Sequence, residues 1–121
     1  MSAASCNEKQ DVYLGIDPGK DGALVVISSS GRVIASFMTG RDFTMNIGKG
    51  SKREYTVSRM AYAIKCLSGT HNIKLAAIEK QSARPGQGVT STFSTGYGYG
   101  LWVALLSSSS VPFVEVRPKT W

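Results

Sequence analysis

Residues 11–28 read DVYLGIDPGKDGALVVIS, in which two apolar runs flank a dense turn signal. Residues 11–16 and 23–28 are rich in apolar, often β-branched side chains and predict two strands, the first ending at Asp17. The segment DPGKDG between them has the proline and glycine content of a tight turn. A third apolar run follows a glycine at residues 32–37. These features predict an antiparallel meander of three strands.

The remainder of the sequence shows two helical patterns and two strand patterns. Residues 54–67 and residues 92–106 each carry apolar side chains at three- and four-residue steps, which predicts two amphipathic helices. Residues 73–79 (IKLAAIE) and 111–116 (VPFVEV) predict strands. The apolar stripes are Val57, Met60, Ala61, Ile64 and Leu67 in the first helix, and Phe93, Tyr97, Leu101, Ala104 and Leu105 in the second. The segments predicted to be irregular are residues 39–52, 81–89 and 107–110, with Gly69 ending the first helix.

The order βββαβαβ predicts an α/β domain whose mixed sheet is flanked by helices. Residues 1–10 are expected to form a flexible N-terminal tail, and residues 11–121 a single domain. In this order the first and fourth strands can lie parallel and adjacent. Asp17 and Glu79 would then stand side by side at the same end of the sheet, although they are far apart in the sequence.

The composition limits the class of protein. A chain of 121 residues with 42% hydrophobic content can bury one core, but not two of normal size. Its net charge of +6 favours an anionic partner such as nucleic acid, although many basic proteins bind none. Cys6 and Cys66 fit neither a disulfide framework nor a zinc spacing and are expected to be reduced thiols. Neither a signal peptide nor a membrane span is recognisable, so a soluble intracellular protein is expected.

Asp17 and Glu79 form the candidate catalytic pair. Two carboxylates at neighbouring strand ends repel each other, so a cation between them would be stabilising. Mg²⁺ prefers oxygen ligands and uses one or two carboxylates together with water and substrate phosphate. Two such ions can promote phosphodiester hydrolysis. From spacing alone an ordinary explanation stays open, in which Asp17 is a turn residue and Glu79 a surface acid at a strand end.

Four segments of the sequence together carry a family resemblance. They are GIDPGKDGAL at residues 15–24, IEKQ at 78–81, GYGYGLW at 96–102 and RPKTW at 117–121. In combination they resemble the RuvC-like Holliday junction resolvases, or crossover junction endodeoxyribonucleases, of the ribonuclease H-like superfamily. The phage-type and organellar branches are the most similar, and the resemblance extends over residues 13–121.

The resemblance implies a ribonuclease H-like nuclease domain that resolves four-way DNA junctions as a homodimer in DNA recombination and repair. It implies paired nicks that depend on Mg²⁺ or Mn²⁺, with Asp17 matching the first metal-binding acid of the family and Glu79 the second. The remaining carboxylates of the family lie on a helix after the fifth strand, and no residue of this sequence matches them. That C-terminal helix is therefore expected to be missing, and this chain alone to be inactive or weakly active. The implied location is the cytoplasm or nucleoid, an organelle or a phage-infected cell.

The other acids and the single histidine have simpler explanations. Asp21 is expected to be a turn former, with a metal role as the alternative. Glu115 is expected to form an ion pair with Arg117. Asp42 and Glu54 are expected to be solvated, and His71 to be structural or exposed.

Three groups of residues are candidates for DNA contact. Arg84 is the only charged residue of the glycine-containing loop at 81–89, which suits close approach to a phosphate backbone. The aromatic residues of the second helix could stack on unpaired bases, or they could belong to the core or to a dimer interface. Gly96, Gly98 and Gly100 each lower helix stability by about 1 kcal/mol, so a close contact is expected to explain them. The basic segment before the first helix could contact phosphates or be merely solvated. The DNA-binding candidates are Lys20, Gln81, Arg84, Gln87, Lys49, Lys52, Arg53, Tyr97 and Tyr99, with Arg41 and Phe93 as further members of the basic and aromatic groups.

Two other functions fit parts of the sequence. A binding module could recognise branched DNA without cutting it, because the last metal-binding acids have no match. A nucleotide-binding fold of the actin and sugar-kinase type also begins with a strand and a glycine-bearing turn. That fold needs two such domains around the nucleotide, and this chain has room for one.

Overall fold

The antiparallel meander expected at the start of the chain is present in the computed structural model, which describes residues 8–118. Strand β1 (Gln10–Asp17) pairs with β2 (Ala23–Ser28), and β2 pairs with β3 (Val33–Met38). The amide of Gly22 donates a hydrogen bond to the carbonyl oxygen of Gly19, which closes the turn between the first two strands. The turn segment therefore connects β1 directly to its antiparallel neighbour, as the sequence predicts.

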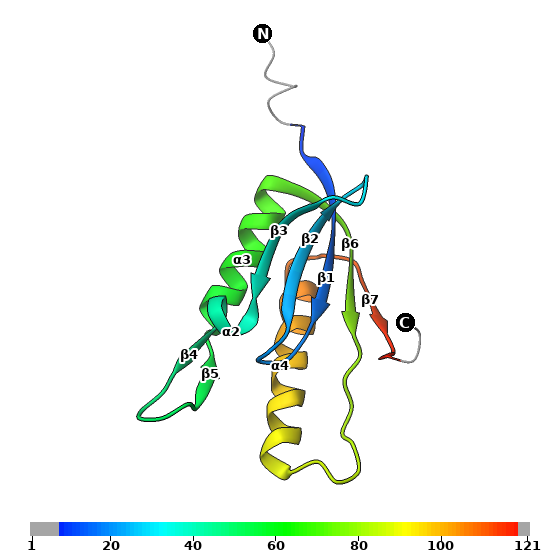
Figure 1. Cartoon of the computed structure of the whole chain (residues 1–121). Helices are drawn as coiled ribbons and strands as arrows, with labels where there is room; N and C mark the ends of the chain where they lie inside the picture. The colour runs from blue at the N-terminus through cyan, green and yellow to red at the C-terminus, as the bar shows by residue number, and fades with distance from the viewer. Residues whose placement is uncertain (1–7, 119–121) are drawn as a thin grey trace.

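Two strand–helix–strand crossovers complete the sheet. Helix α3 (Val57–Thr70) leads into β6 (His71–Glu79), and α4 (Val89–Ser108) is followed by β7 (Phe113–Val116). Strand β6 pairs in parallel with both β1 and β7, so the strand order is β3-β2-β1-β6-β7 (Figure 1). The mixed sheet and the adjacency of the first and fourth predicted strands are thus confirmed.

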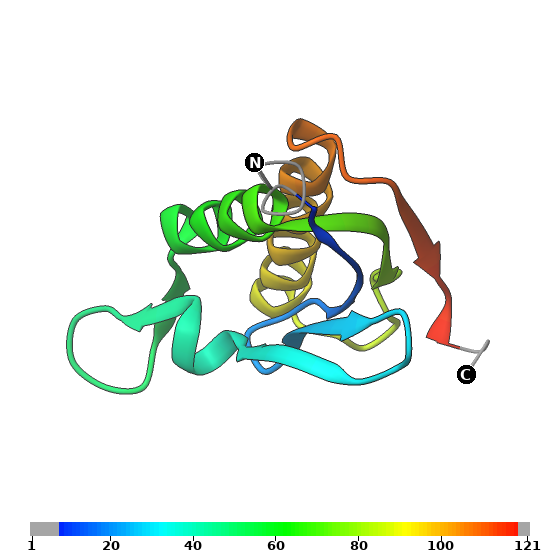
Figure 2. The ribbon, with the colours of Figure 1, turned by 90° about the horizontal axis from the view of Figure 1, so that it is seen from above.

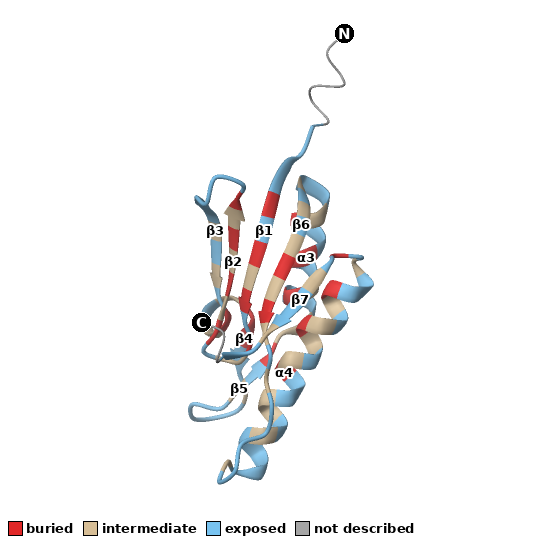
Figure 3. Ribbon diagram, turned by 90° about the vertical axis from the view of Figure 1, so that its right-hand side faces the viewer, coloured by how far each residue is buried: buried red, intermediate tan, exposed pale blue. Residues whose placement is uncertain are grey.

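The two long helices lie on one face of the sheet (Figure 2). Along β1, Leu14 and Ile16 are buried, whereas Tyr13 and Asp17 alternate with them and are exposed (Figure 3). Because Asp17 alternates with the buried residues of β1, it points to the face opposite the core, whereas α3 and α4 pack on the core face (Figure 2). The core between the sheet and the helices includes Val12, Leu14, Ile16, Leu24, Val26, Phe43, Tyr55, Met60, Ile64, Ala76, Ile78, Trp102 and Leu106.

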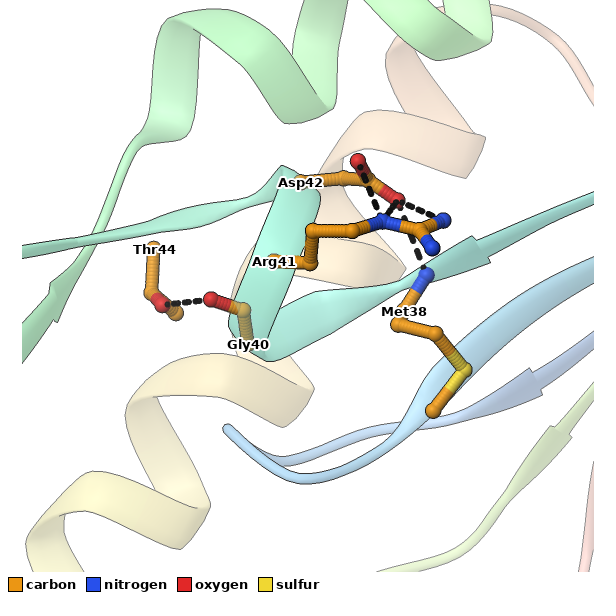
Figure 4. Close-up of polar contacts among 5 residues, drawn as sticks. All are labelled: Met38, Gly40, Arg41, Asp42 and Thr44. Carbon is orange, nitrogen blue, oxygen red and sulfur yellow. Dashed lines mark hydrogen bonds and ion pairs between the residues drawn. The ribbon is translucent and has the colours of Figure 1, made fainter.

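The prediction that residues 39–52 are irregular was wrong for residues 39–42 and 44–46 and correct for residues 47–52. The segment begins with the short helix α2 (Thr39–Asp42) and the strand β4 (Thr44–Asn46), and β4 pairs in a hairpin with β5 (Arg53–Tyr55), which follows the segment. The Asp42 carboxylate accepts hydrogen bonds from the Met38 amide and the Arg41 guanidinium, so Asp42 is not simply solvated (Figure 4). Strands of three residues are too short to show a periodic pattern, and for that reason the sequence did not indicate them.

Helix α3 begins and ends later than predicted. Glu54 belongs to β5, so the helix starts at Val57 and continues through Gly69 to Thr70. Gly69 does not adopt the positive φ of a glycine helix cap. The chain therefore passes from helix to β6 without a glycine stop, and β6 begins at His71 rather than at residue 73.

Helix α4 buries a different face from the predicted apolar stripe. Its buried residues are Gly98, Trp102 and Leu106, whereas Phe93 and Tyr97 of the predicted stripe are exposed. Apolar and small residues surround this helix on all sides, so the sequence pattern does not single out one buried face. Within residues 8–118, no helix is both long enough and apolar enough to cross a membrane.

Gln10, which the sequence assigns to an N-terminal tail, belongs to the sheet. Gln10 pairs with His71 and is the first residue of β1. Residues 1–7, including Cys6, lie outside the described part of the chain. Cys66 is an exposed free thiol, as the sequence predicts.

Candidate metal centre and nucleic-acid interface

Asp17 and Glu79 end the two central strands of the sheet. In the parallel pairing of β1 with β6, Gly15 lies opposite Ala77 and Ile16 opposite Ile78, so the two acids follow at the same edge. Both line one concavity of about 360 Å³ on the sheet face not covered by the long helices; its other lining residues are Gly15, Ile16, Ala23, Val25 and Ala77. The topology therefore brings the predicted carboxylate pair to a single shallow site.

The two carboxylates interact electrostatically. Partial burial raises the pKa of Asp17 above its usual value, and the nearby Glu79 carboxylate raises it further. The Glu79 carboxylate also accepts a hydrogen bond from Gln81, with 3.1 Å between Oε1 and Nε2. A cation placed between the acids would relieve the repulsion that Asp17 experiences.

We expect Asp17→Asn to stabilise the metal-free protein near pH 7. Because the folded-state pKa is raised, ionised Asp17 opposes folding; this cost is absent below the unfolded pKa, grows as the pH rises and is complete above the folded pKa. The gain should be at most about 1 kcal/mol, since water screens an exposed side chain. Thermal unfolding in EDTA between about pH 3 and 8 measures it.

The exposed acid Glu54 provides a control for that experiment, because the Glu54→Gln variant loses one negative charge away from the carboxylate pair. It should show a smaller change in melting temperature over the same pH range. A melting temperature of Asp17→Asn below that of the parent at pH 7 in EDTA would contradict the electrostatic interpretation.

The donor atoms of this site suit a hard divalent cation. Carboxylate oxygens are the ligands that Mg²⁺ and Mn²⁺ accept, and one or two of them suffice when water and phosphate supply the rest. Residues 8–118 contain no group of three or more His, Cys, Asp and Glu side chains that could hold a metal. Asp17 and Glu79 would therefore hold a cation with only two carboxylates from the described part of the chain.

The remaining candidate acids are engaged elsewhere or stand apart. Asp21 forms an ion pair with Arg53, at 2.7 Å between Oδ1 and the guanidinium. Glu115 does not form the predicted ion pair with Arg117 in the range 8–118, where the chain forms two other ion pairs. His71 has a structural contact, since its Nδ1 lies 2.9 Å from the hydroxyl of Thr70.

The sequence of this chain matches no protein-family model and no curated protein. Its structure is similar to RuvC of T. thermophilus in complex with a Holliday junction substrate, with a TM-score of 0.61 and 19% identity over 89% of this chain. A second Thermus thermophilus RuvC structure gives a TM-score of 0.57 and 21% identity over 88% of this chain. The chain has a RuvC-like fold. It spans 65% and 64% of the two RuvC chains, which is slightly less than two thirds.

The RuvC-like fold confirms the ribonuclease H-like sheet that the sequence motifs imply. The loop between β6 and α4 begins directly after Glu79 and extends beyond the end of the sheet (Figure 1). In this loop Gln87 is held by its own neighbours: its Oε1 accepts from the Arg84 amide, and its Nε2 donates to Ser91 and Thr95. The Arg84 side chain is exposed and forms no hydrogen bond or ion pair with any residue in the described range. Arg84 is thus available to an anion, whereas Gln81 and Gln87 already have partners.

The basic residues of the predicted second patch divide into two groups. Arg41 is paired with Asp42, and Arg53 with Asp21. Lys49 and Lys52 are exposed in the turn of the β4–β5 hairpin, which projects from the RuvC-like core at the end of the sheet where β1 and β6 terminate (Figure 1). Of these four residues, Lys49 and Lys52 present cations to solvent that are unpaired within the described structure.

Aromatic side chains continue from the hairpin onto α4. Tyr55 meets Tyr97 edge to face, with 5.8 Å between ring centroids, and Tyr97 stacks on Phe93 at 6.3 Å. Phe93 is 74% exposed and Tyr97 45% exposed, so neither is a core residue. Tyr99 differs, because it packs against the core and its hydroxyl is buried without a partner among the described residues.

The three helix glycines have different environments. A Cβ at Gly98 would overlap the Tyr55 ring, so this glycine has the close contact that the sequence analysis expected. A Cβ at Gly96 or Gly100 would meet nothing within 4 Å. No close contact within the described structure therefore accounts for glycine at positions 96 and 100.

Sequence reasoning missed Tyr55 and a second concavity, which is lined by basic residues. The alternation of Arg53, Glu54 and Tyr55 is compatible with a strand, but three residues are too few to establish one. The concavity is lined by Lys80, Ser82, Arg117 and Pro118, just beyond the ends of β6 and β7. In the sequence, a basic residue directly follows each of these strands, Lys80 after β6 and Arg117 after β7, and this pattern could have indicated the concavity.

Proposed function

We propose that this chain provides the metal-binding core of a structure-selective endodeoxyribonuclease that resolves four-way DNA junctions. The observation that carries the proposal is the placement of Asp17 and Glu79 at the ends of adjacent parallel strands in one concavity. The fold supports it, since a structure with a similar fold is RuvC in complex with a Holliday junction substrate. Unpaired cations and exposed aromatic rings at the same end of the sheet provide a surface for DNA.

In the proposed reaction the chain contributes ligands, orientation and phosphate contacts. Asp17 and Glu79 would hold Mg²⁺ or Mn²⁺, and Gln81 would orient the Glu79 carboxylate through the hydrogen bond already present. A bound divalent ion supplies a more acidic water and neutralises charge on the phosphodiester. Arg84, Lys49 and Lys52 would hold the DNA backbone.

We further propose that the chain acts as a homodimer and that additional carboxylates complete its metal site. Paired nicks in a symmetric junction require two active sites, which a homodimer supplies. The exposed face of α4 with Gly96 and Gly100 is open to a close contact with DNA or with a second copy. The sheet face carrying Asp17 is open to an element that would add further carboxylates.

The alternative is a module that binds branched DNA without cutting it. The observation that favours it is the absence, within residues 8–118, of a third His, Cys, Asp or Glu side chain that could complete a metal site with the pair. Holding two cations against their mutual repulsion requires more negative ligands than two carboxylates provide. The nuclease and the binding module would use the same DNA-binding surface, but only the nuclease would hydrolyse a phosphodiester bond.

We expect the protein to bind a four-way junction more tightly than a duplex of the same sequence, with affinity that falls steeply as salt rises, because phosphate contacts release counterions. Arg84→Ala should weaken binding by about 3- to 10-fold without changing sequence preference. Gel-shift titrations in EDTA at several salt concentrations measure both effects, and Arg41→Gln is the control because Asp42 already pairs with that side chain.

Incubation of the bound junction with Mg²⁺ then separates the two functions. Nicking that disappears in both Asp17→Asn and Glu79→Gln supports the nuclease, whereas undiminished binding without nicking supports the binding module. Equal affinity for junction and duplex, or affinity that does not change with salt, would overturn the proposed substrate.

A further inference from the structure

The turn that follows Asp17 is clamped to the β4–β5 hairpin by reciprocal polar contacts. Lys20 donates from Nζ to the carbonyl oxygen of Arg53 at 2.7 Å, and Arg53 donates from a guanidinium nitrogen to the carbonyl oxygen of Lys20 at 3.4 Å. The second terminal guanidinium nitrogen of Arg53 lies 2.7 Å from the Asp21 carboxylate. We call Lys20, Asp21 and Arg53 the turn clamp.

The surroundings are shaped to hold the turn clamp. A Cβ at Gly40 would overlap the Arg53 guanidinium, so glycine at that position leaves room for the side chain. The Arg53 side chain is 30% exposed, whereas Asp21 is 92% exposed. The backbone contacts of the clamp are therefore better shielded from water than its ion pair, and they should contribute more.

The turn clamp also reaches α4 through Tyr55. The Lys20 ammonium lies 5.7 Å from the centroid of the Tyr55 ring, within the range of a cation–π contact. Tyr55 in turn packs against Gly98 and Tyr97 of α4. The turn after Asp17 is thus tied to β5 and, through Tyr55, to α4.

We propose that Arg53 is a positioning residue, which fixes the turn after Asp17 and thereby holds that carboxylate beside Glu79. The proposal rests on the proposed function in taking Asp17 and Glu79 as the metal ligands. Their mutual repulsion acts to move the end of β1 and the turn after it away from β6, and the turn clamp opposes that movement. Lys20 and Arg53, which the sequence offers as DNA-binding residues, are thereby assigned to the support of the metal site.

The test compares Arg53→Gln with Lys52→Gln, which removes the same charge from the neighbouring exposed position. We expect Arg53→Gln to weaken Mn²⁺ binding about tenfold, the effect of losing charge-assisted hydrogen bonds. Hydrogen exchange at the Gly22 amide should accelerate by a similar factor, whereas exchange at the buried Ile64 amide in α3 stays close to that of the parent. Lys52→Gln should leave both quantities unchanged.

Two more variants separate positioning from general destabilisation. Arg53→Lys keeps one donor and should restore part of the Mn²⁺ affinity, because it can reach one of the two former partners. Asp21→Asn should change the affinity by less than about twofold, since the ion pair is exposed. If Arg53→Gln accelerates exchange equally at Gly22 and Ile64, Arg53 is a general structural residue and the proposal is overturned.

The outcomes also distinguish this proposal from the proposed function. If the wild-type protein shows no measurable Mn²⁺ binding, the proposed function is overturned. The hydrogen-exchange rate of the Gly22 amide in Arg53→Gln would still test the turn clamp. Arg53→Gln that loses junction affinity but keeps parental Mn²⁺ affinity and parental Gly22 exchange would make Arg53 a phosphate contact and overturn its positioning role.

Discussion

Gly22→Ala is expected to destabilise the fold by about 3 kcal/mol or more, among the largest effects of any single methyl group in this chain. Gly22 is buried in the turn after Asp17, its amide donates to Gly19, and its carbonyl accepts from Thr39. A Cβ at this position would overlap the carbonyl oxygen and carbon of Asp17. Both are backbone atoms, so no side-chain rotation can relieve the overlap.

Thermal unfolding and Mn²⁺ titration measure the consequences of Gly22→Ala. The turn must open to accommodate the methyl group, so metal affinity at Asp17 should fall even at temperatures where the variant is still folded. Gly69→Ala is the matched control, because that helical glycine has open space around its Cβ position. It should stabilise α3 by about 0.5–1 kcal/mol. A Gly22→Ala protein with parental melting temperature and metal affinity would show that the turn tolerates a different backbone path.

Trp102→Ala is expected to lower stability by about 3–5 kcal/mol, the usual cost of removing a large buried aromatic side chain. Trp102 has no exposed surface and meets the ring of Phe43 edge to face, with 5.4 Å between centroids. It joins α4 to the segment that precedes the hairpin, so its loss should loosen both elements. Chemical denaturation monitored by far-UV circular dichroism measures the change, because this signal does not depend on tryptophan fluorescence.

Trp102→Phe provides the graded comparison for this core site. The indole nitrogen of Trp102 has no hydrogen-bond partner among residues 8–118, so replacing it with an apolar ring removes an unsatisfied donor. The loss should therefore be less than about 1.5 kcal/mol, despite the smaller volume. Phe93→Ala, at an exposed position of the same helix, should change stability by less than about 0.5 kcal/mol. Equal losses for Trp102→Ala and Phe93→Ala would contradict the assigned core.

The sequence by itself determined the strands that carry the candidate site. The apolar runs before Asp17 and Glu79 are long enough to show strand character, and the intervening order of elements allows one arrangement in which both acids share an edge. The motifs around these acids also indicated the RuvC-like fold that the structural similarity confirms. Local chemistry and chain order were sufficient here, because strand ends and crossovers follow general rules.

Tertiary structure decided which polar side chains remain available for DNA. Arg53 and Lys20 are cationic side chains of the type that binds phosphate, yet both are engaged in the turn clamp, whereas the Arg84 side chain forms no hydrogen bond or ion pair with the described residues. Charge and spacing cannot distinguish these cases, because partners more than 30 residues apart in sequence meet only after the hairpin folds against the turn.

Tertiary structure also decided the buried face of α4. Phe93 and Trp102 lie on the same helix and are both large aromatic residues, but one is exposed and the other is in the core. Apolar and small residues occur on every side of this helix, so its tertiary packing, which includes the contacts with Phe43 and Tyr55, selects the buried face. The sequence thus specified the carboxylate pair, and long-range packing specified the surface and the support around it.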